Sequence, residues 1–283
     1  MGHNLPRILV FVLFVMLTGA AGNAVAMQQH YETPLLHARW SVQKAPLSCS
    51  LEHRIPRFGV ARFQQSVDEP LAFVIDGEHP LPADSEALVE LVPVKWQHAR
   101  VPEALGRFAA GEAHALKLDG DYARTLLVGL ESGMVPAVSW GSEAHPRQVQ
   151  VTMNVLFFRQ ALREFDACIA ALPEAGFEDL RRSEFFYGRN ERALGRAARQ
   201  RLERIAFYLK NNPDVDYVEI LGYADDRGSR RYNRALSRER AQAVKQFLQQ
   251  QGIDADRLRI KAMGEVKQQS RRARRVEITL YRK

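Results

Sequence analysis

Asp225 and Arg240 are the residues of this chain whose types and spacing most clearly predict chemistry. They stand fifteen positions apart in a charged segment that runs from Gly222 to Ala241. A carboxylate accepts hydrogen bonds from an ammonium, and a guanidinium pairs with a carboxylate through two parallel bonds. The pattern predicts a site for a small ligand that carries both an ammonium and a carboxylate.

A direct ion pair between Asp225 and Arg240 is the alternative, because charged runs are usually solvated or paired among themselves. On spacing alone, the ligand site and the internal pair explain the pattern equally well. The other arginines of the segment are expected to form a solvated basic surface: Arg227, Arg230, Arg231, Arg234 and Arg238.

The flanking elements would position the two charged groups. An apolar strand at 217–222 precedes the segment, and a helix follows it. Gly222 allows close backbone approach and Gly228 a tight turn. Asn233 is predicted to cap the helix, whose free amide groups favour an anion.

An α/β alternation surrounds this segment. The helix stop at 173–176 predicts a domain boundary, which divides a domain at 27–176 from one at 177–283. In the second domain the apolar periodicity predicts the order βαβαββ, a small sheet with its helices on one face. The expected strands lie near 185–187, 217–222, 258–262 and 276–280.

The first domain reads mainly as β structure. Residues 149–155 alternate with period two, and helices are expected at 121–131 and 157–171. We therefore predict an α+β protein whose N-terminal domain is β-rich and barrel- or sandwich-like. Its tryptophans are expected to pack in the core: Trp40, Trp96 and Trp140.

The first 26 residues have the pattern of an export signal. Arg7 precedes an apolar stretch at 8–21, and Ala24-Val25-Ala26 gives a small-x-small cleavage site. The stretch is shorter than the ~20 residues that a membrane span needs. We expect cleavage after Ala26 and a mature chain without a transmembrane segment.

Charge is shared unevenly between the two predicted domains. Residues 27–176 carry 13 basic and 18 acidic side chains, and residues 177–283 carry 26 basic and 15 acidic ones. Such a shift predicts two modules with different partners. Export makes an acidic wall polymer or an envelope protein a better partner for the basic module than nucleic acid.

Cys49 and Cys168 are the only cysteines of the chain. In an oxidising compartment an even pair most simply forms one disulfide, and two unpaired thiols are the alternative.

The charged segment resembles the OmpA-like peptidoglycan-binding domain family, and the resemblance covers about residues 177–283. The motif consists of Asp225, Gly228, Tyr232-Asn233, Leu236-Ser237 and Arg240-Ala241, with a late Arg274-Arg275-Val276-Glu277. The resemblance implies that Asp225 and Arg240 bind the diaminopimelate of the wall stem peptide. It implies a peptidoglycan-binding role also for Gly228, Asn233, Leu236 and Ser237.

Some positions depart from the family pattern. Tyr223-Ala224 replaces His-Thr, Ala273 replaces Asn, and the loop from Gly264 to Arg274 is short. The wall of the site that this loop contributes in the family is therefore not implied for this chain, and binding weaker than in the family is expected.

The N-terminal half is similar to the MotY family of periplasmic flagellar motor proteins. The similarity lies in Trp40, in the run from Cys49 to Gly59, and in a second Cys on a helix ahead of the OmpA-like part. It implies an N-terminal domain that docks to the flagellar basal body and to MotB-type stator proteins, within a ring around the rod. The C-terminal domain would tie that ring to peptidoglycan.

Two other functions are weighed against this motor anchor. One is a generic periplasmic OmpA-like tether without a motor role. The other is a wall-cleaving enzyme, for which the chain has neither a Gly-x-Ser-x-Gly nor a His-Glu-x-x-His motif. We expect no catalytic residues, no metal site and no cofactor.

Overall fold

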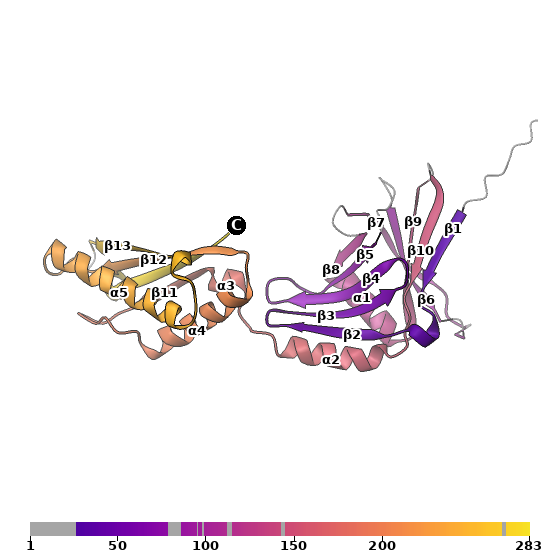
Figure 1. Ribbon diagram of the computed structural model, residues 1–283, viewed down its shortest axis with the longest axis horizontal. Helices are drawn as coiled ribbons and strands as arrows, with labels where there is room; N and C mark the ends of the chain where they lie inside the picture. Colours follow the sequence, from indigo (N-terminus) through magenta and orange to yellow (C-terminus); the bar gives the residue numbers. More distant parts are fainter. Residues whose placement is uncertain are drawn as a thin grey trace, which may run out of the picture.

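The computed structural model describes residues 27–283, except for 79–85, 95, 98, 112–114, 143–144 and 268–269. The predicted export signal at 1–26 lies outside the described residues. Figure 1 shows two lobes, joined by the segment between α2 (Phe158–Ala170) and α3 (Phe177–Arg181). Among the described residues, no helix is both long and apolar enough to cross a bilayer.

The N-terminal lobe is built from two five-stranded sheets. The first has the spatial order β1 (Met27–Glu32), β10 (His145–Thr152), β9 (Met134–Ser142), β6 (Glu86–Pro93), β7 (Glu103–Ala109). The second has the order β2 (Trp40–Ala45), β3 (Ser48–Ile55), β4 (Gly59–Ser66), β5 (Ala72–Gly77), β8 (Leu116–Asp119). The second sheet's β2, β3 and β4 run across Figure 1, whereas β9 and β10 run up it.

One hydrophobic core joins these two sheets. Phe63 and Phe73 from the second sheet cluster with Val89 and Val138 from the first, and all four are fully buried. Helices α1 (Asp121–Glu131) and α2 add apolar side chains to the same cluster. The predicted sandwich-like, β-rich domain of an α+β protein is confirmed.

The tryptophans divide between core and surface. Trp40 and Trp140 are buried, and the Trp40 indole donates to the Asn154 carbonyl at 2.7 Å. Trp96 is 61% exposed, so the prediction of core packing was wrong for it. It lies in the irregular segment between β6 and β7, where no strand alternation directs its side chain inward.

The C-terminal lobe confirms the predicted βαβαββ order. Its elements are β11 (Arg182–Phe186), α4 (Arg196–Asn211), β12 (Val215–Ala224), α5 (Arg230–Gln250), β13 (Leu258–Glu265) and β14 (Arg275–Arg282). The sheet order is β11-β14-β12-β13, with β12 parallel to β13 and antiparallel to β14. Leu202 of α4 and Val244 of α5 pack in one core with Ile220 and Ile278 of the sheet.

The two lobes meet at Asp68, in the turn between β4 and β5. Its Oδ2 accepts hydrogen bonds from the Tyr208 hydroxyl at 2.6 Å and from Arg282 Nη2 at 2.8 Å. Its Oδ1 accepts from the Phe177 amide at 2.6 Å. Burial and this carboxylate raise the pKa of Tyr208 to about 12, so its hydroxyl stays a donor.

Leu47, from the β2–β3 turn, is buried in the core of the C-terminal lobe. The predicted boundary after residue 176 remains a prediction.

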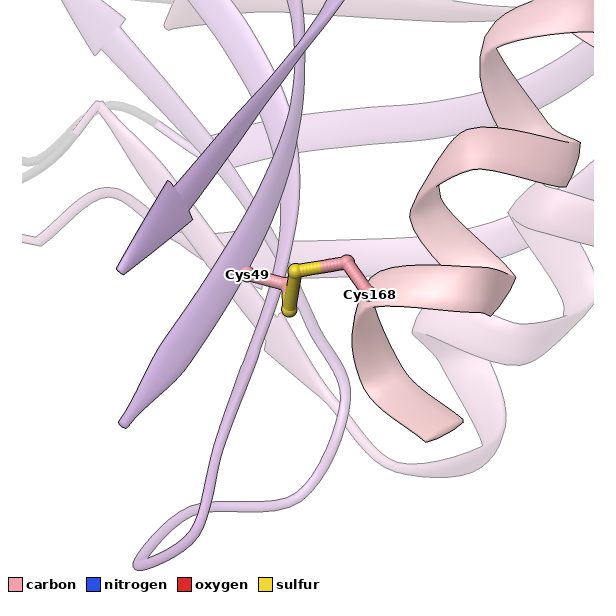
Figure 2. The surroundings of a disulfide bond; sticks show 2 residues. All are labelled: Cys49 and Cys168. Atoms are coloured by element: carbon pink, nitrogen blue, oxygen red, sulfur yellow. A yellow bond between two sulfur atoms is a disulfide. The ribbon is translucent and has the colours of Figure 1, made fainter. Parts of the chain in front are cut away.

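Cys49 and Cys168 form a disulfide between β3 and α2, as expected for a pair of cysteines in an oxidising compartment (Figure 2). The bond links residues 119 positions apart and holds α2 against the second sheet.

Removing the disulfide should destabilise the N-terminal lobe. For the double variant Cys49→Ser/Cys168→Ser we expect a loss of up to ~4–5 kcal/mol on the chain-entropy model, because the unfolded chain gains a long open loop. Urea unfolding measures the loss. Reductant should lower the midpoint of the native protein and leave that of the double variant unchanged. Equal midpoints for native protein and variant without reductant would contradict the expectation.

Asp68→Ala should loosen the junction between the lobes. The change removes the acceptor of four donors, the fourth being Asn212 Nδ2. Each buried donor that stays unpaired costs ~1–3 kcal/mol. We expect a lower thermal midpoint and a larger radius of gyration in small-angle scattering. Glu69→Ala is the matched control, because Glu69 pairs with Lys117 within the N-terminal lobe. Scattering profiles that coincide for native protein and Asp68→Ala would refute the role of Asp68.

Candidate ligand-binding site of the C-terminal domain

The site forms where β12 passes into α5. Ser229 caps the helix, and its hydroxyl accepts from the Tyr232 amide at 3.2 Å. The prediction that Asn233 is the cap was wrong: it lies one turn inside the helix, where its Nδ2 donates to Glu265 Oε2 at 3.3 Å. The helix begins earlier than expected because Ser229 meets the same capping requirement.

Two glycines permit this geometry. A Cβ on Gly222 would lie 2.0 Å from the Ser237 carbonyl oxygen, so only glycine lets α5 approach β12 this closely. Gly228 has φ +92°, a left-handed conformation that disfavours other residues. Both glycines do what the sequence predicted for them.

Arg240 is fully buried, and its guanidinium is bonded to the backbone. Nε donates to the Glu191 carbonyl at 2.9 Å, Nη1 to that of Tyr223 at 3.2 Å, and Nη2 to that of Gly188 at 3.1 Å. The Tyr187 ring lies 4.9 Å from the guanidinium carbon. Burial lowers the pKa of Arg240, against the opposing effects of Tyr187 and Asp225. The guanidinium therefore ties α5 to the end of β12 and to the segment before α4.

Asp225 is 6% exposed and pairs with Arg274. Arg274 Nη1 donates to Asp225 Oδ2 at 3.0 Å, and Arg274 Nε donates to the Tyr187 carbonyl at 3.2 Å. The alternative of a direct pair between Asp225 and Arg240 is not found, because each side chain has its own hydrogen-bond partners. In the sequence, Arg274 belongs to the late family motif, but nothing there indicated that it forms an ion pair with Asp225.

The other predicted site residues support the fold of the site. Leu236 is buried in α5. The Ser237 hydroxyl donates to the Arg234 carbonyl at 3.0 Å and accepts from the Gly264 amide at 3.2 Å, which joins α5 to β13. Their part in ligand binding, like that of Asp225, Gly228, Asn233 and Arg240, remains a prediction.

Three buried side-chain oxygens, each within a few positions of a residue of the site along the chain, have no hydrogen-bond partner among the described residues: the Tyr187 hydroxyl, Asp226 Oδ1 and Ser270 Oγ. Burial raises the pKa of Tyr187 to about 12, so the hydroxyl keeps its proton at neutral pH. Buried polar groups in folded proteins usually have a partner. The arrangement is therefore that of a candidate polar site, with one carboxylate close to two guanidinium groups.

Each of the two lobes matches a known protein family. Residues 186–282 match the OmpA family, and residues 31–173 match the MotY N-terminal domain. The fold and the site thus define a protein with an OmpA-family domain at its C-terminus. The chain belongs to the MotY N-terminal domain family.

Individual relatives match either most of the chain or its C-terminal part. The chain is 26% identical over 255 residues to the sodium-type flagellar protein MotY of Vibrio parahaemolyticus. The alignment covers 88% of this chain and 87% of that protein. It is 35% identical over 82 residues to the peptidoglycan-associated lipoprotein of Agrobacterium fabrum. That alignment covers 29% of this chain and 46% of the lipoprotein.

A similar solved structure is the peptidoglycan-associated lipoprotein from Burkholderia pseudomallei. The identity is 24% over 35% of this chain and 89% of that chain, with a TM-score of 0.32. For the periplasmic domain of Helicobacter pylori MotB, the identity is 23% over 35% of this chain and 70% of that chain, with a TM-score of 0.30.

Replacing Arg240 should destabilise the C-terminal lobe. Arg240→Gln leaves backbone carbonyls without donors in a closed space, so we expect a loss of at least ~2 kcal/mol in the free energy of unfolding. Arg238→Gln, an exposed position on the same helix, is the matched control. Chemical denaturation compares the two variants. An Arg240→Gln protein as stable as the control would show that the carbonyl contacts contribute little.

Proposed function

We propose that this chain is a non-enzymatic structural component of a bacterial flagellar motor, located in the periplasm, whose C-terminal domain binds peptidoglycan. The observation that carries the proposal is the combination of a MotY N-terminal domain at 31–173 with an OmpA-family domain at 186–282. The relative that aligns with 88% of the chain is named as a flagellar protein, which supports the motor assignment.

The N-terminal lobe is the proposed docking module. It would bind the basal body and MotB-type stator proteins, within a ring around the rod, and so stabilise the stator units. Its net negative charge contrasts with the positive C-terminal lobe, which favours different partners for the two.

The site around Asp225 is the proposed attachment point to the wall. Diaminopimelate in the stem peptide carries an ammonium and a carboxylate, and the site brings Asp225 near both Arg240 and Arg274. A carboxylate can accept hydrogen bonds from an ammonium, and guanidinium groups can donate to a carboxylate. These charges support binding without any catalytic step.

Deleting the gene from a motile host tests the motor role. We expect filaments to assemble while swimming is poor, because stator units would lose their anchor. The full chain restored from a plasmid should recover swimming. Normal swimming after deletion would favour a generic wall tether, and loss of the filaments would point to a role in assembly.

Asp225→Asn should weaken wall binding at least about tenfold, since it removes the charge and keeps the shape. Co-sedimentation of the mature protein with purified sacculi measures the effect. Asp216→Asn, an exposed position on the same strand, serves as the control, and circular dichroism verifies the fold of both variants. Equal binding by Asp225→Asn and native protein would remove Asp225 from the site.

A further inference from the structure

We propose that the end of the N-terminal lobe farthest from the C-terminal lobe is its docking surface, and that it inserts into an apolar groove with an acidic rim on a motor protein. The surface consists of three exposed apolar side chains, here called the apolar tip: Leu35, Leu36 and Phe157. The inference rests on the proposed function and names the surface and the partner chemistry of the docking module.

The apolar tip stands out from the lobe. Leu36 is 91% exposed, Leu35 is 57% exposed and Phe157 is 62% exposed. Single exposed apolar side chains are ordinary on protein surfaces, whereas gathered ones mark interaction sites. The two leucines lie in the short turn η1 (Leu35–His37), far in the sequence from the phenylalanine.

Buried Asn154 joins the two segments that carry the apolar tip. Its Nδ2 donates to the Thr33 carbonyl at 3.4 Å, and its carbonyl accepts from the Trp40 indole at 2.7 Å, so both flanks of the leucine turn are held. Its Oδ1 accepts from the Leu156 amide at 2.9 Å, next to the phenylalanine. The tip is therefore ordered before a partner arrives, which lowers the entropic cost of binding.

Phe157 is held in a conformation that does not favour folding. Its φ of +62° is left-handed, where a bulky residue is an outlier. It also occupies the N-cap position of α2, where its side chain makes no capping hydrogen bond. Residues kept in such conformations concentrate at functional sites. The strained backbone and the exposed ring thus point independently to the same surface.

Helix α2 separates the apolar tip from the C-terminal lobe. The helix begins directly after Phe157 and has 13 residues, a length of roughly 20 Å. Figure 1 shows one end of α2 beside the indigo turn at 35–37, and the other end leading into the segment that joins the lobes. The tip and the candidate wall site therefore lie at opposite ends of the chain's folded body, so both can be occupied at once.

Basic side chains surround the apolar tip. Three segments at this end of the lobe carry basic but no acidic residues: 33–39, 54–58 and 154–159. The Thr33 hydroxyl donates to the Arg54 carbonyl at 2.9 Å, which joins the first segment to the second. Arg54 reaches Glu78 at 3.6 Å, but that pair is exposed and therefore weak. Electrostatic complementarity favours a partner with acidic residues around its apolar groove.

The charge of the remaining lobe favours a protein partner over a bilayer. Apolar side chains with a basic rim also suit an anionic membrane surface. Residues 27–176, however, carry 13 basic and 18 acidic side chains, so an extended anionic surface would repel the lobe outside the tip. A groove on a protein meets the tip alone.

Co-sedimentation of the mature protein with purified flagellar basal bodies, taken from a host that lacks the gene, tests the docking surface. Leu36→Ser should weaken this binding at least about tenfold, because it removes the most exposed apolar side chain of the tip. Val128→Ser is the matched control, an apolar side chain of α1 that is 56% exposed, and should bind like the native protein.

Two further variants test the strain and the charge. Phe157→Asn should weaken binding as much as Leu36→Ser, while its thermal midpoint stays at or above that of the native protein, because asparagine accepts the left-handed conformation. Arg39→Glu should also weaken binding, whereas Arg124→Glu, an exposed arginine of α1, should not. Binding to sacculi should be the same in all these variants and in the native protein.

The outcomes separate the docking surface from the motor role. If Leu36→Ser and Phe157→Asn sediment with basal bodies like the native protein, the docking surface is overturned and the motor role stands. Sedimentation of the native protein with vesicles of phosphatidylethanolamine and phosphatidylglycerol, lost in Leu36→Ser, would replace the protein partner with a membrane. A native protein that does not sediment with basal bodies would overturn the motor docking and this surface together.

Discussion

The burial of the Arg240 guanidinium is the constraint on which the functional end of the C-terminal lobe depends. A cation removed from water must find hydrogen-bond acceptors, and here they are carbonyls at Gly188, Glu191 and Tyr223. One side chain therefore determines where α5, the end of β12 and the segment before α4 lie relative to one another. The approach of α5 to β12 at Gly222 makes this possible, because a Cβ there would collide with the Ser237 carbonyl. Asp225 follows β12 directly, so its position is set by the same contacts.

Much of the fold could be predicted from the sequence because its signals are local. Apolar periodicity located helices α1 and α2 to within a residue and gave the βαβαββ order. Strand ends were harder: β12 runs from Val215 to Ala224, beyond the apolar run at 217–222, because backbone pairing with β13 and β14 continues past the hydrophobic residues. The exposure of Trp96 could not be predicted, since hydrophobicity gives no direction for a side chain outside regular structure.

The candidate site shows the same division between local and distant information. The sequence identified Asp225, Arg240 and the two glycines from spacing along one segment. It could not identify the hydrogen-bond partner of Asp225, because that partner, Arg274, lies 49 residues further along the chain. Nor could it reveal that the Arg240 guanidinium donates to three backbone carbonyls. Every residue has such a carbonyl, so residue types do not indicate which carbonyls lie near Arg240. The cap was misplaced from Ser229 to Asn233 because both residue types suit a helix start, and only the backbone path selects between them.

Strand β14 connects the two places where the chain is held. Arg274, which immediately precedes the strand, pairs with Asp225 at the candidate wall site, and Arg282, its last residue, pairs with Asp68 of the N-terminal lobe. Eight residues of extended chain span roughly 25 Å, and β14 is hydrogen-bonded on both sides, to β11 and to β12. In the proposed anchor, the chain between the candidate wall site and the N-terminal lobe therefore runs along an internal strand. Such a strand resists extension far better than a loop, because its neighbours would have to slide with it. The basic residues at its two ends thus connect the candidate wall site to the lobe proposed to face the motor.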